Sequence, residues 1–350
     1  MKLTSDLMSK RIFSLDVFRG LAVLIMILVD APPAESYDIL SHSQWEGMTL
    51  ADVAFPAFVF AMGASAAISN SRRPSTYKKI FRRAGLLFLI GIIFNELGYI
   101  FAYLLTENFT TADFYKNAIE NLRVFGILQR LALSYLFGML IVKLIESDKG
   151  ILIAAFTILL ASSAGYHIYA PENPFNEDDN LSRAVDLIFP GANHIYTYQT
   201  MNDPEGFYGT FATTVSMLFG YIAGKILLDG EKVRRLLIFG TALLIIGIGW
   251  SFFEIIAKKI WTSPFALLNA GIDSIFTAII IATPQFEKFL QPLAALGKSP
   301  LFFFLASNVI LIILLTLNFL NDAVIFCWVW AALWLIIAVL IDKLGIVIKL

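Results

Sequence analysis

Charged side chains are scarce in this chain of 350 residues. Asp, Glu, Lys and Arg together make up 15% of it, whereas hydrophobic residues make up 58%. A water-soluble protein averages about 25% charged residues. This chain therefore has too few polar side chains to cover a globule, and its apolar surface must face lipid. The composition excludes a soluble globular protein and predicts a multi-pass membrane protein that lies in a lipid bilayer.

Cysteine, histidine and excess positive charge are also lacking. Cys327 is the only cysteine, which excludes an intramolecular disulfide and a cysteine metal site. The three histidines, His42, His167 and His194, are scattered along the chain and predict no metal site. The formal net charge of −1 argues against a nucleic-acid partner, because such proteins usually carry a basic stripe.

Ten apolar stretches approach the length that a helix needs to cross a bilayer, about 20 residues. Glycines lie inside these stretches and phenylalanine dominates the aromatic residues, which suits closely packed helices better than a water-filled barrel. We therefore predict an all-α polytopic membrane protein in which residues 1–350 form a single transmembrane domain. The ten predicted spans are 14–31, 49–69, 81–105, 122–145, 150–169, 207–229, 234–257, 263–284, 299–319 and 323–344.

The distribution of Lys and Arg predicts the orientation of these spans. Most of the 26 Lys and Arg residues fall on loops and helix ends that share a side with residue 1. Because such an excess marks the cytoplasmic side, we expect both termini to be cytoplasmic. The two long polar loops, 32–48 and 170–206, then face outward. The same rule is sufficient to explain the basic inner loop 72–83.

Several charged residues fall within the predicted spans, where a charge is costly and needs a partner. Asp16 and Arg19 are three residues apart, so we expect them to pair on one helical face. Glu96 and Arg130 both fall in the outer half of their spans, and we expect an ion pair between them. Structural pairing explains such residues better than a direct role. The others are Asp52, Glu254 and Asp273.

The outer loop 32–48 contains His42, which has no evident structural task. Thr49 and Asp52 form a capping box that would start the second span. Similarly, Asp203 is typical of an N-cap that would start the sixth span. An imidazole titrates near about pH 6.5, so it can accept a proton from an attacking amine or carry an acyl group. His42 is therefore a candidate catalytic residue, although a lone histidine in a loop is more often inert.

Short blocks spread over nearly the whole chain resemble the transmembrane acetyltransferase family of heparan-α-glucosaminide N-acetyltransferase and its bacterial relatives. Any one block is weak, but all of them together and in the family's order are specific. The blocks are Arg11 with 14–20, then His42, Trp45, Gly47, Thr49 and Asp52 with 55–65, and further 123–130, 203–206, 259–263 and 296–301.

The resemblance implies an acyltransferase that takes acetyl from cytoplasmic acetyl-CoA and delivers it to an amino sugar or glycan on the outer face. It implies a homodimer in the bacterial cytoplasmic (inner) membrane, without the luminal domain of the animal enzyme. It places catalysis at His42, as general base or transient acetyl carrier. Arg19 and Lys298 lie in matched blocks and are the candidates to bind the phosphates of acetyl-CoA. The acceptor is expected at the two outer loops, where we name Trp45, Asp203 and Glu205.

Asp30 departs from the family pattern, which commonly has an asparagine at the end of the first span. An asparagine can donate a hydrogen bond to a developing oxyanion, whereas an aspartate more naturally orients and charges an imidazole. We therefore expect Asp30 to act with His42 in a His–Asp pair. A non-catalytic paralogue is the alternative that this departure leaves open.

A proton-coupled transporter is the rival from another functional class. Its relay would use the intramembrane residues Glu96, Arg130, Glu254 and Asp273, with His42 as a gate. No pair of broken helices in corresponding halves of the sequence supports this alternative.

Overall fold

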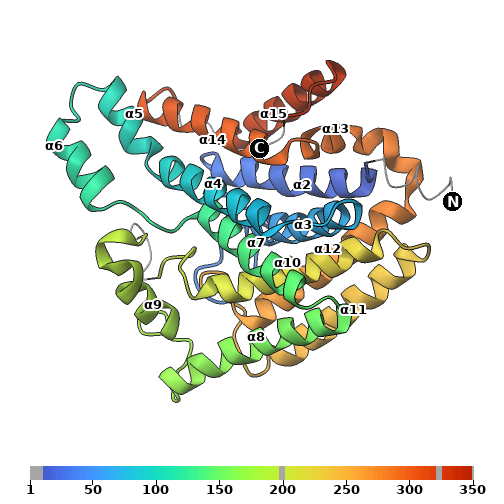
Figure 1. The fold of residues 1–350 in the computed structure, drawn as a ribbon. Coiled ribbons are helices and arrows are strands. Elements are labelled where there is room, and N and C mark those ends of the chain that lie inside the picture. The colour runs from blue at the N-terminus through green and yellow to red at the C-terminus, as the bar shows by residue number, and fades with distance from the viewer. Residues whose placement is uncertain (1–10, 197–201, 321–324, 349–350) are drawn as a thin grey trace.

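The protein is built from helices. The computed structural model describes residues 11–196, 202–320 and 325–348, and Figure 1 shows its helices packed side by side in one bundle. The predicted all-α fold is confirmed. The helices of the described residues are α2 (Phe13–Asp30), α3 (Leu50–Arg72), α4 (Tyr77–Asn95), α5 (Leu97–Leu105), α6 (Thr111–Phe114), α7 (Ile127–Leu144), α8 (Asp148–Tyr169), α9 (Leu181–Asp186), α10 (Gly209–Ile226), α11 (Lys232–Trp250), α12 (Ser263–Ala282), α13 (Glu287–Gly297), α14 (Pro300–Thr316) and α15 (Phe326–Lys343). Short 3-10 or π turns occupy Ala34–Ser36, Tyr115–Glu120, Leu187–Gly191, Ala192–His194 and Pro284–Phe286.

Each of the ten predicted spans coincides with a helix or a bent helix pair, although residues 323 and 324 lie outside the described chain. Two details differ. The span predicted at 81–105 is divided at Glu96, where α4 and α5 meet at 45°. Helix α13 was not predicted, and it meets α14 at 69°. Pro300 is the first residue of α14, a position where proline begins a new helix.

Within the described residues, six helices are long and apolar enough to cross a membrane, or up to eight if each bent pair is one span. Helices α2 and α10 are outside this set. Nearly every residue of α10 is buried by other helices, so it does not need an apolar surface for lipid. The count of ten spans and the cytoplasmic placement of both termini stay predictions, and residues 1–10, 349 and 350 lie outside the described chain.

Close contact between α2 and α13 depends on two glycines. A Cβ at Gly20 would lie 1.8 Å from the carbonyl oxygen of Leu293, and a Cβ at Gly297 would lie 1.7 Å from that of Asp16. Gly220 has the same function where α10 crosses α3. Small residues let the backbones of membrane helices approach closely. These contacts hold the helices that carry the site in a fixed relative position.

The two ends of the described chain meet beside Lys298. The guanidinium of Arg11 donates to the carbonyl oxygen of Lys298 at 3.3 Å, and the Lys298 ammonium bonds Asp342 at 2.5 Å. The backbone N–H of Ile348 donates to the hydroxyl of Ser299 at 3.0 Å. Residues 11 and 348 therefore lie at the same end of the bundle, as the orientation predicted from Lys and Arg requires.

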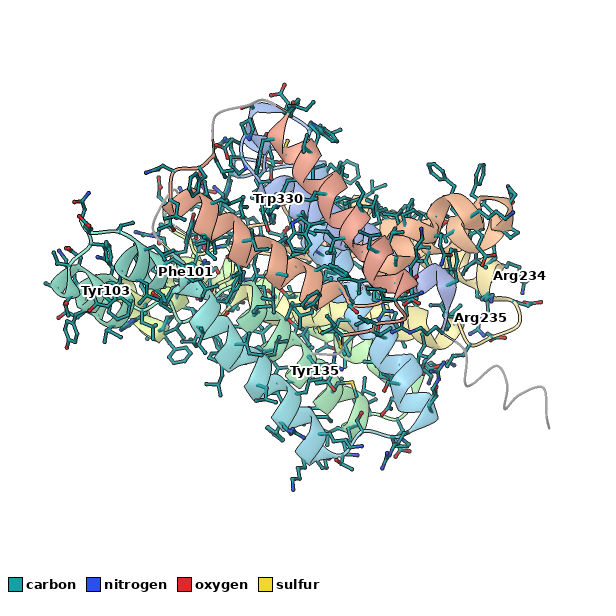
Figure 2. All side chains as sticks on the ribbon, turned by 90° about the horizontal axis from the view of Figure 1, so that it is seen from above. Phe101, Tyr103, Tyr135, Arg234, Arg235 and Trp330 are labelled. Carbon is teal, nitrogen blue, oxygen red and sulfur yellow. The ribbon has the colours of Figure 1, made fainter. Side chains whose placement is uncertain are left out.

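The bundle has two chemically different ends. Figure 2 shows Phe101 and Tyr103 at one end, and Arg234 and Arg235 at the other. Tyr103 belongs to the outer end in the predicted orientation, whereas the two arginines begin α11 at the inner end. We use the terms outer end and inner end in this sense below.

The ion pair predicted between Glu96 and Arg130 is wrong. A Glu96 carboxylate oxygen accepts a hydrogen bond from the backbone N–H of Arg123 at 3.1 Å. The Arg130 guanidinium donates instead to the carbonyl oxygen of Gly206 at 2.9 Å. The loop after α6 folds back onto α4 and supplies a backbone donor, so Glu96 has a partner without Arg130.

Gly297→Ala tests the contact between α2 and α13. The added methyl group would overlap backbone atoms that cannot rotate away, so we expect the free energy of unfolding to fall by about 1–3 kcal/mol. Gly85→Ala is the matched control, because nothing lies within 4 Å of a Cβ at that position in α4. Thermal unfolding in detergent should show a lower midpoint for Gly297→Ala only. Equal midpoints for the two variants would contradict this account of the packing.

Candidate functional site

Residues 41–52 fold as a closed loop around the carboxylate of Asp52. Asp52 lies in the first turn of α3, and one of its oxygens accepts hydrogen bonds from the backbone N–H groups of Ser43 and Thr49, both at 3.0 Å. The predicted capping role of Asp52 is confirmed. Its side chain is fully buried. The start of α3 therefore holds this part of the outer loop in place.

The second oxygen of Asp52 faces His42, a pairing that the sequence analysis missed. It lies 2.9 Å from Nδ1 of the imidazole. Because an ionised carboxylate only accepts hydrogen bonds, we assign the Nδ1 proton to this contact, which leaves the lone pair of Nε2 available. The His42 side chain is 51% exposed. A buried carboxylate that orients an accessible imidazole is the arrangement of a general base or a nucleophile.

Lys258 also contacts this pair, and nothing in the sequence pattern had indicated it. It comes from the loop between α11 and α12. Its Nζ lies 2.9 Å from Nδ1 and 3.3 Å from Nε2 of His42, and 3.3 Å from the near oxygen of Asp52. An atom on the lone-pair axis of one ring nitrogen would be much farther from the other. The ammonium therefore lies over the face of the ring.

Burial lowers the pKa of Lys258, against the attraction of the carboxylates of Asp52, Glu205 and Asp30. These three carboxylates come from α3, from the segment before α10, and from the end of α2. Lys258 is thus attracted by three carboxylates that come from separate parts of the chain.

Asp30 is the last residue of α2, and its carboxylate accepts a hydrogen bond from the Asn308 side chain at 3.1 Å. The direct partner of His42 in the structure is Asp52, whose bond to Nδ1 occupies the place that sequence analysis gave to Asp30. The charge of Asp30 still acts on Lys258 across the site. Asp30 therefore adds negative charge beside the His42–Asp52 pair.

Arg123 binds the two acidic residues that precede α10. Its guanidinium lies 3.0 Å from Asp203 and 2.7 Å from Glu205, and it stacks on the ring of Tyr196. Asp203 is not the N-cap that its sequence context predicted, because α10 begins only at Gly209. Its carboxylate instead accepts from the backbone N–H groups of Tyr196 and Glu205, at 2.8 and 2.9 Å. Sequence analysis had placed Arg123 in a matched block without giving it a role.

The carboxyl of Glu205 is shaped by two opposing effects. Burial raises its pKa, but the positive charges of Arg123, Arg130 and Lys258 outweigh burial and bring the pKa below its ordinary value. Glu205 is therefore a stable negative charge at the outer end.

Trp45 belongs to the first outer loop. Its indole N–H donates to the carbonyl oxygen of Phe175 at 3.0 Å, and this hydrogen bond joins the two outer loops.

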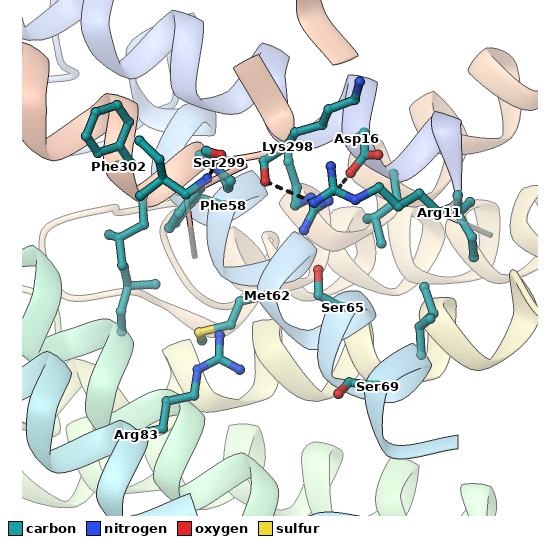
Figure 3. A pocket seen from close by; sticks show the side chains of 18 of the residues that line it. Arg11, Asp16, Phe58, Met62, Ser65, Ser69, Arg83, Lys298, Ser299 and Phe302 are labelled. Atoms are coloured by element: carbon teal, nitrogen blue, oxygen red, sulfur yellow. Dashed lines mark hydrogen bonds and ion pairs between the residues drawn. The ribbon is translucent and has the colours of Figure 1, made fainter. Parts of the chain in front are cut away.

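The inner end contains a cavity of about 640 Å³ between α2, α3, α4 and α14. Figure 3 shows Arg11, Arg83 and Lys298 around it, together with the apolar side chains of Phe58 and Met62. Arginines of the loop 72–83 line it as well, so this basic loop forms part of the cavity wall. The lining cations are Arg11, Arg19, Arg72, Arg73, Arg83 and Lys298.

One acidic residue, Asp16, lies among these cations. It pairs with Arg19, which confirms the pair predicted from their spacing. Both donor-site candidates from the sequence, Arg19 and Lys298, line this cavity. Asp342 pairs with Lys298, so the six lining cations are opposed by two carboxylates. The cavity keeps an excess of positive charge and suits a ligand that carries several negative charges.

Comparison with known sequences identifies the family of this chain. A family model described as heparan-alpha-glucosaminide N-acetyltransferase, catalytic, matches residues 11–238. This chain belongs to that family. The human protein named heparan-alpha-glucosaminide N-acetyltransferase is 27% identical over 270 residues, which cover 62% of this chain and 39% of the human protein. The mouse protein of the same name is 34% identical over 134 residues, which cover 36% of this chain and 18% of the mouse protein.

The family assignment confirms the resemblance predicted from the sequence, and with it a transmembrane N-acetyltransferase family. The matched regions cover well under half the length of each of these two relatives. The family match includes His42, Asp52 and Arg123, whereas Lys258 and Lys298 lie beyond its last residue. The structure brings Lys258 back to His42 through the fold.

Asp186, at the end of α9, gives the outer loop a predictable pH dependence. Burial, reinforced by the charge of Asp203, raises its pKa to about 7, against the hydrogen bond from the backbone N–H of Phe207. Between about pH 4 and pH 7 the unfolded chain has lost this proton while the folded chain keeps it. The free energy of unfolding should therefore fall as pH rises through this window, by up to about 1.4 kcal/mol per pH unit.

Asp186→Asn should remove this loss, because the amide stays neutral. We expect the difference in unfolding midpoint, variant minus wild type, to be larger at pH 8 than at pH 5. Asp178→Asn, in an exposed position of the same loop, should leave the difference between the two pH values unchanged. A parallel shift of Asp186→Asn at both pH values would show that Asp186 is ionised throughout.

Proposed function

We propose that this protein transfers an acetyl group from acetyl-CoA, bound in the inner cavity, to an amino sugar or glycan at the outer end. One observation carries the proposal. A buried carboxylate, Asp52, orients His42 at one end of the bundle, while a cavity with six cations opens at the other end. The family supplies the reaction class. The inner cavity would bind the donor on one side of the membrane, and the site at His42 would bind the acceptor on the other.

The inner cavity suits the donor because coenzyme A combines phosphates with a long, less polar arm. The cations at its mouth, Arg19 and Lys298 among them, would bind the phosphates. Phe58, Met62 and Leu131 line its depth and would cover the arm. The phosphates of the donor would thus stay at the inner end while the acetyl group enters the bundle.

The acetyl group must then approach His42. Arg19 and Asp30 lie on the same helix, α2, and are separated by about 16 Å along its axis. The acyl end of an extended donor would cover this distance inside the bundle. His42 would receive the acetyl on Nε2 or take the proton of the attacking amine, and Asp52 would stabilise the positive charge that develops on the ring in both cases.

The acceptor would bind at the outer end, where negative charge attracts an amino sugar in its ammonium form. Asp30 and Glu205 both act electrostatically on the position of Lys258 beside His42. With a carboxylate where the family commonly has an asparagine, Asp30 would hold the amine before it loses its proton. Trp45 and Asp203 would shape the acceptor site by fixing the two outer loops.

The cellular setting is part of the same proposal. The excess of Lys and Arg on one side supports a cytoplasmic inner cavity, so that acetyl-CoA would enter from the cytoplasm. We propose a homodimer in the bacterial inner membrane, on the strength of the family resemblance. The transporter alternative gains two bent helix pairs that the sequence did not indicate, α4 with α5 and α13 with α14. Its proposed relay gains no support, because Glu96 and Glu254 bond the backbone N–H groups of Arg123 and Ser263.

His42→Ala tests the proposed chemistry. Loss of the imidazole should reduce acetyl transfer to glucosamine by about 10²–10⁴-fold, while a half-exposed loop residue contributes little packing, so the thermal midpoint should hardly change. Product is measured by mass spectrometry with purified protein in detergent. His167→Ala, an exposed histidine at the end of α8, is the control and should retain activity. Near-normal turnover of His42→Ala would exclude the assignment.

Charge removal tests the donor cavity. Replacing Lys298, Arg19 or Arg83 by Ala should each weaken acetyl-CoA binding about 10- to 150-fold, since a hydrogen bond to a charged group contributes about 1.5–3 kcal/mol. Arg82→Ala is the matched control, because Arg82 is exposed and does not line the cavity. Calorimetry should separate the two groups. If Arg82→Ala weakened binding as much as the others, the donor would bind outside the cavity.

A further inference from the structure

Lys258 presents an amine beside the imidazole of His42, next to the place that an acetyl group on this ring would occupy. Its Nζ is 2.9 and 3.3 Å from the two ring nitrogens and therefore lies over the ring face. An acetyl group on Nε2 would be conjugated with the imidazole and lie close to its plane. A nucleophile attacks such a carbonyl from above or below that plane. Nζ therefore lies on a face of the ring from which an amine would approach that carbonyl.

The amine is also within reach of such an acetyl group. Nζ lies 3.3 Å from Nε2, and the acetyl carbon would be one bond beyond that nitrogen. A rotation of the flexible lysine side chain would bring Nζ to the separation of about 3–3.5 Å from which a bond forms. An amine must be neutral to attack, and burial lowers the pKa of Lys258, which increases its neutral fraction. An oxygen of Asp52 lies 3.3 Å from Nζ and can accept a hydrogen bond from the amine, which orients it.

The neighbouring lysine does not share this geometry. Lys259 has a nearly equal side-chain exposure, 16% against 15% for Lys258. Its Nζ pairs with Glu177 at 3.1 Å and lies over the ring of Trp45. Two adjacent lysines of the same exposure therefore differ in their access to His42, which makes Lys259 an internal control.

We propose that Lys258 is an internal acetyl acceptor, modified by the enzyme's own reaction when the outer site holds no amine substrate. This inference rests on the function proposed above. The bond between the acetyl carbon and the sulfur of coenzyme A breaks and that sulfur leaves as the thiol. A bond forms between the acetyl carbon and Nζ of Lys258, directly or after transfer through Nε2 of His42. Lys258 reacts as the neutral amine, after its ammonium form has released one proton to water. The proton that this amine loses as the amide forms passes to the imidazole and then to the departing thiolate.

The modification would change the site as well as mark it. An amide carries no charge, so acetylation removes the cation beside Asp52 and leaves the negative charges of Asp30 and Glu205 unopposed by Lys258. A bound amino sugar competes for the same acetyl group. The extent of acetylation at Lys258 would therefore fall as the acceptor concentration rises.

The test uses the purified full-length protein in detergent with acetyl-CoA that carries a deuterated acetyl group and with no acceptor. Peptide mass spectrometry then measures the label on each lysine. We expect occupancy at Lys258 to exceed that at Lys259 by at least about 100-fold, because proximity alone gives effective molarities far above any reagent in solution. Saturating glucosamine and His42→Ala should each suppress the label at Lys258. Lys258→Arg should remove it from the protein.

The outcomes separate this inference from the proposed function. If glucosamine is acetylated but Lys258 never carries label, the inference is overturned and the proposed function stands. Equal label on Lys258 and Lys259, or label that persists in His42→Ala, reflects direct chemical reaction with acetyl-CoA and also overturns it. If neither glucosamine nor Lys258 is labelled, both the inference and the proposed function are overturned.

Discussion

The carboxylate of Asp52 is the point on which the outer site depends. One oxygen holds the backbone of Ser43 and Thr49 at the start of α3, and the other faces His42 and Lys258. A fully buried carboxylate is costly unless its hydrogen bonds are satisfied. These partners satisfy it, so the loop, the imidazole and the ammonium are held together by a single side chain. Helix capping and the chemistry of the site are therefore inseparable here.

The second constraint is the arrangement of charge along the central helices. Helix α2 has Arg19 near its inner end and Asp30 at its outer end, and α3 has Asp52 in its first turn and Arg72 in its last. Both helices thus present arginine to the cavity and carboxylate to the outer site. Glycines at the contacts of α2 with α13 and of α3 with α10 fix this arrangement, because bulkier residues would push the backbones apart.

The sequence predicted the fold well where apolar length decides it, since all ten predicted spans contain helices. It could not predict the bend at Glu96, because the backbone donor that binds this residue comes from a loop 27 residues later. His42 was found as a polar residue without a structural task. Asp52 was missed as its partner because the capping role was already a sufficient explanation, and Lys258 was missed because 216 residues separate it from His42. Such contacts arise from tertiary packing and leave no local pattern.

Transfer from one side of the membrane to the other is the central claim. The most direct measurement uses inside-out membrane vesicles that contain the protein, with acetyl-CoA outside and glucosamine enclosed in the lumen. Because the donor cavity would face outward in these vesicles and His42 inward, N-acetylglucosamine should accumulate in the lumen, and the His42→Ala protein should produce almost none. Product that forms only when donor and acceptor are on the same side would contradict the account.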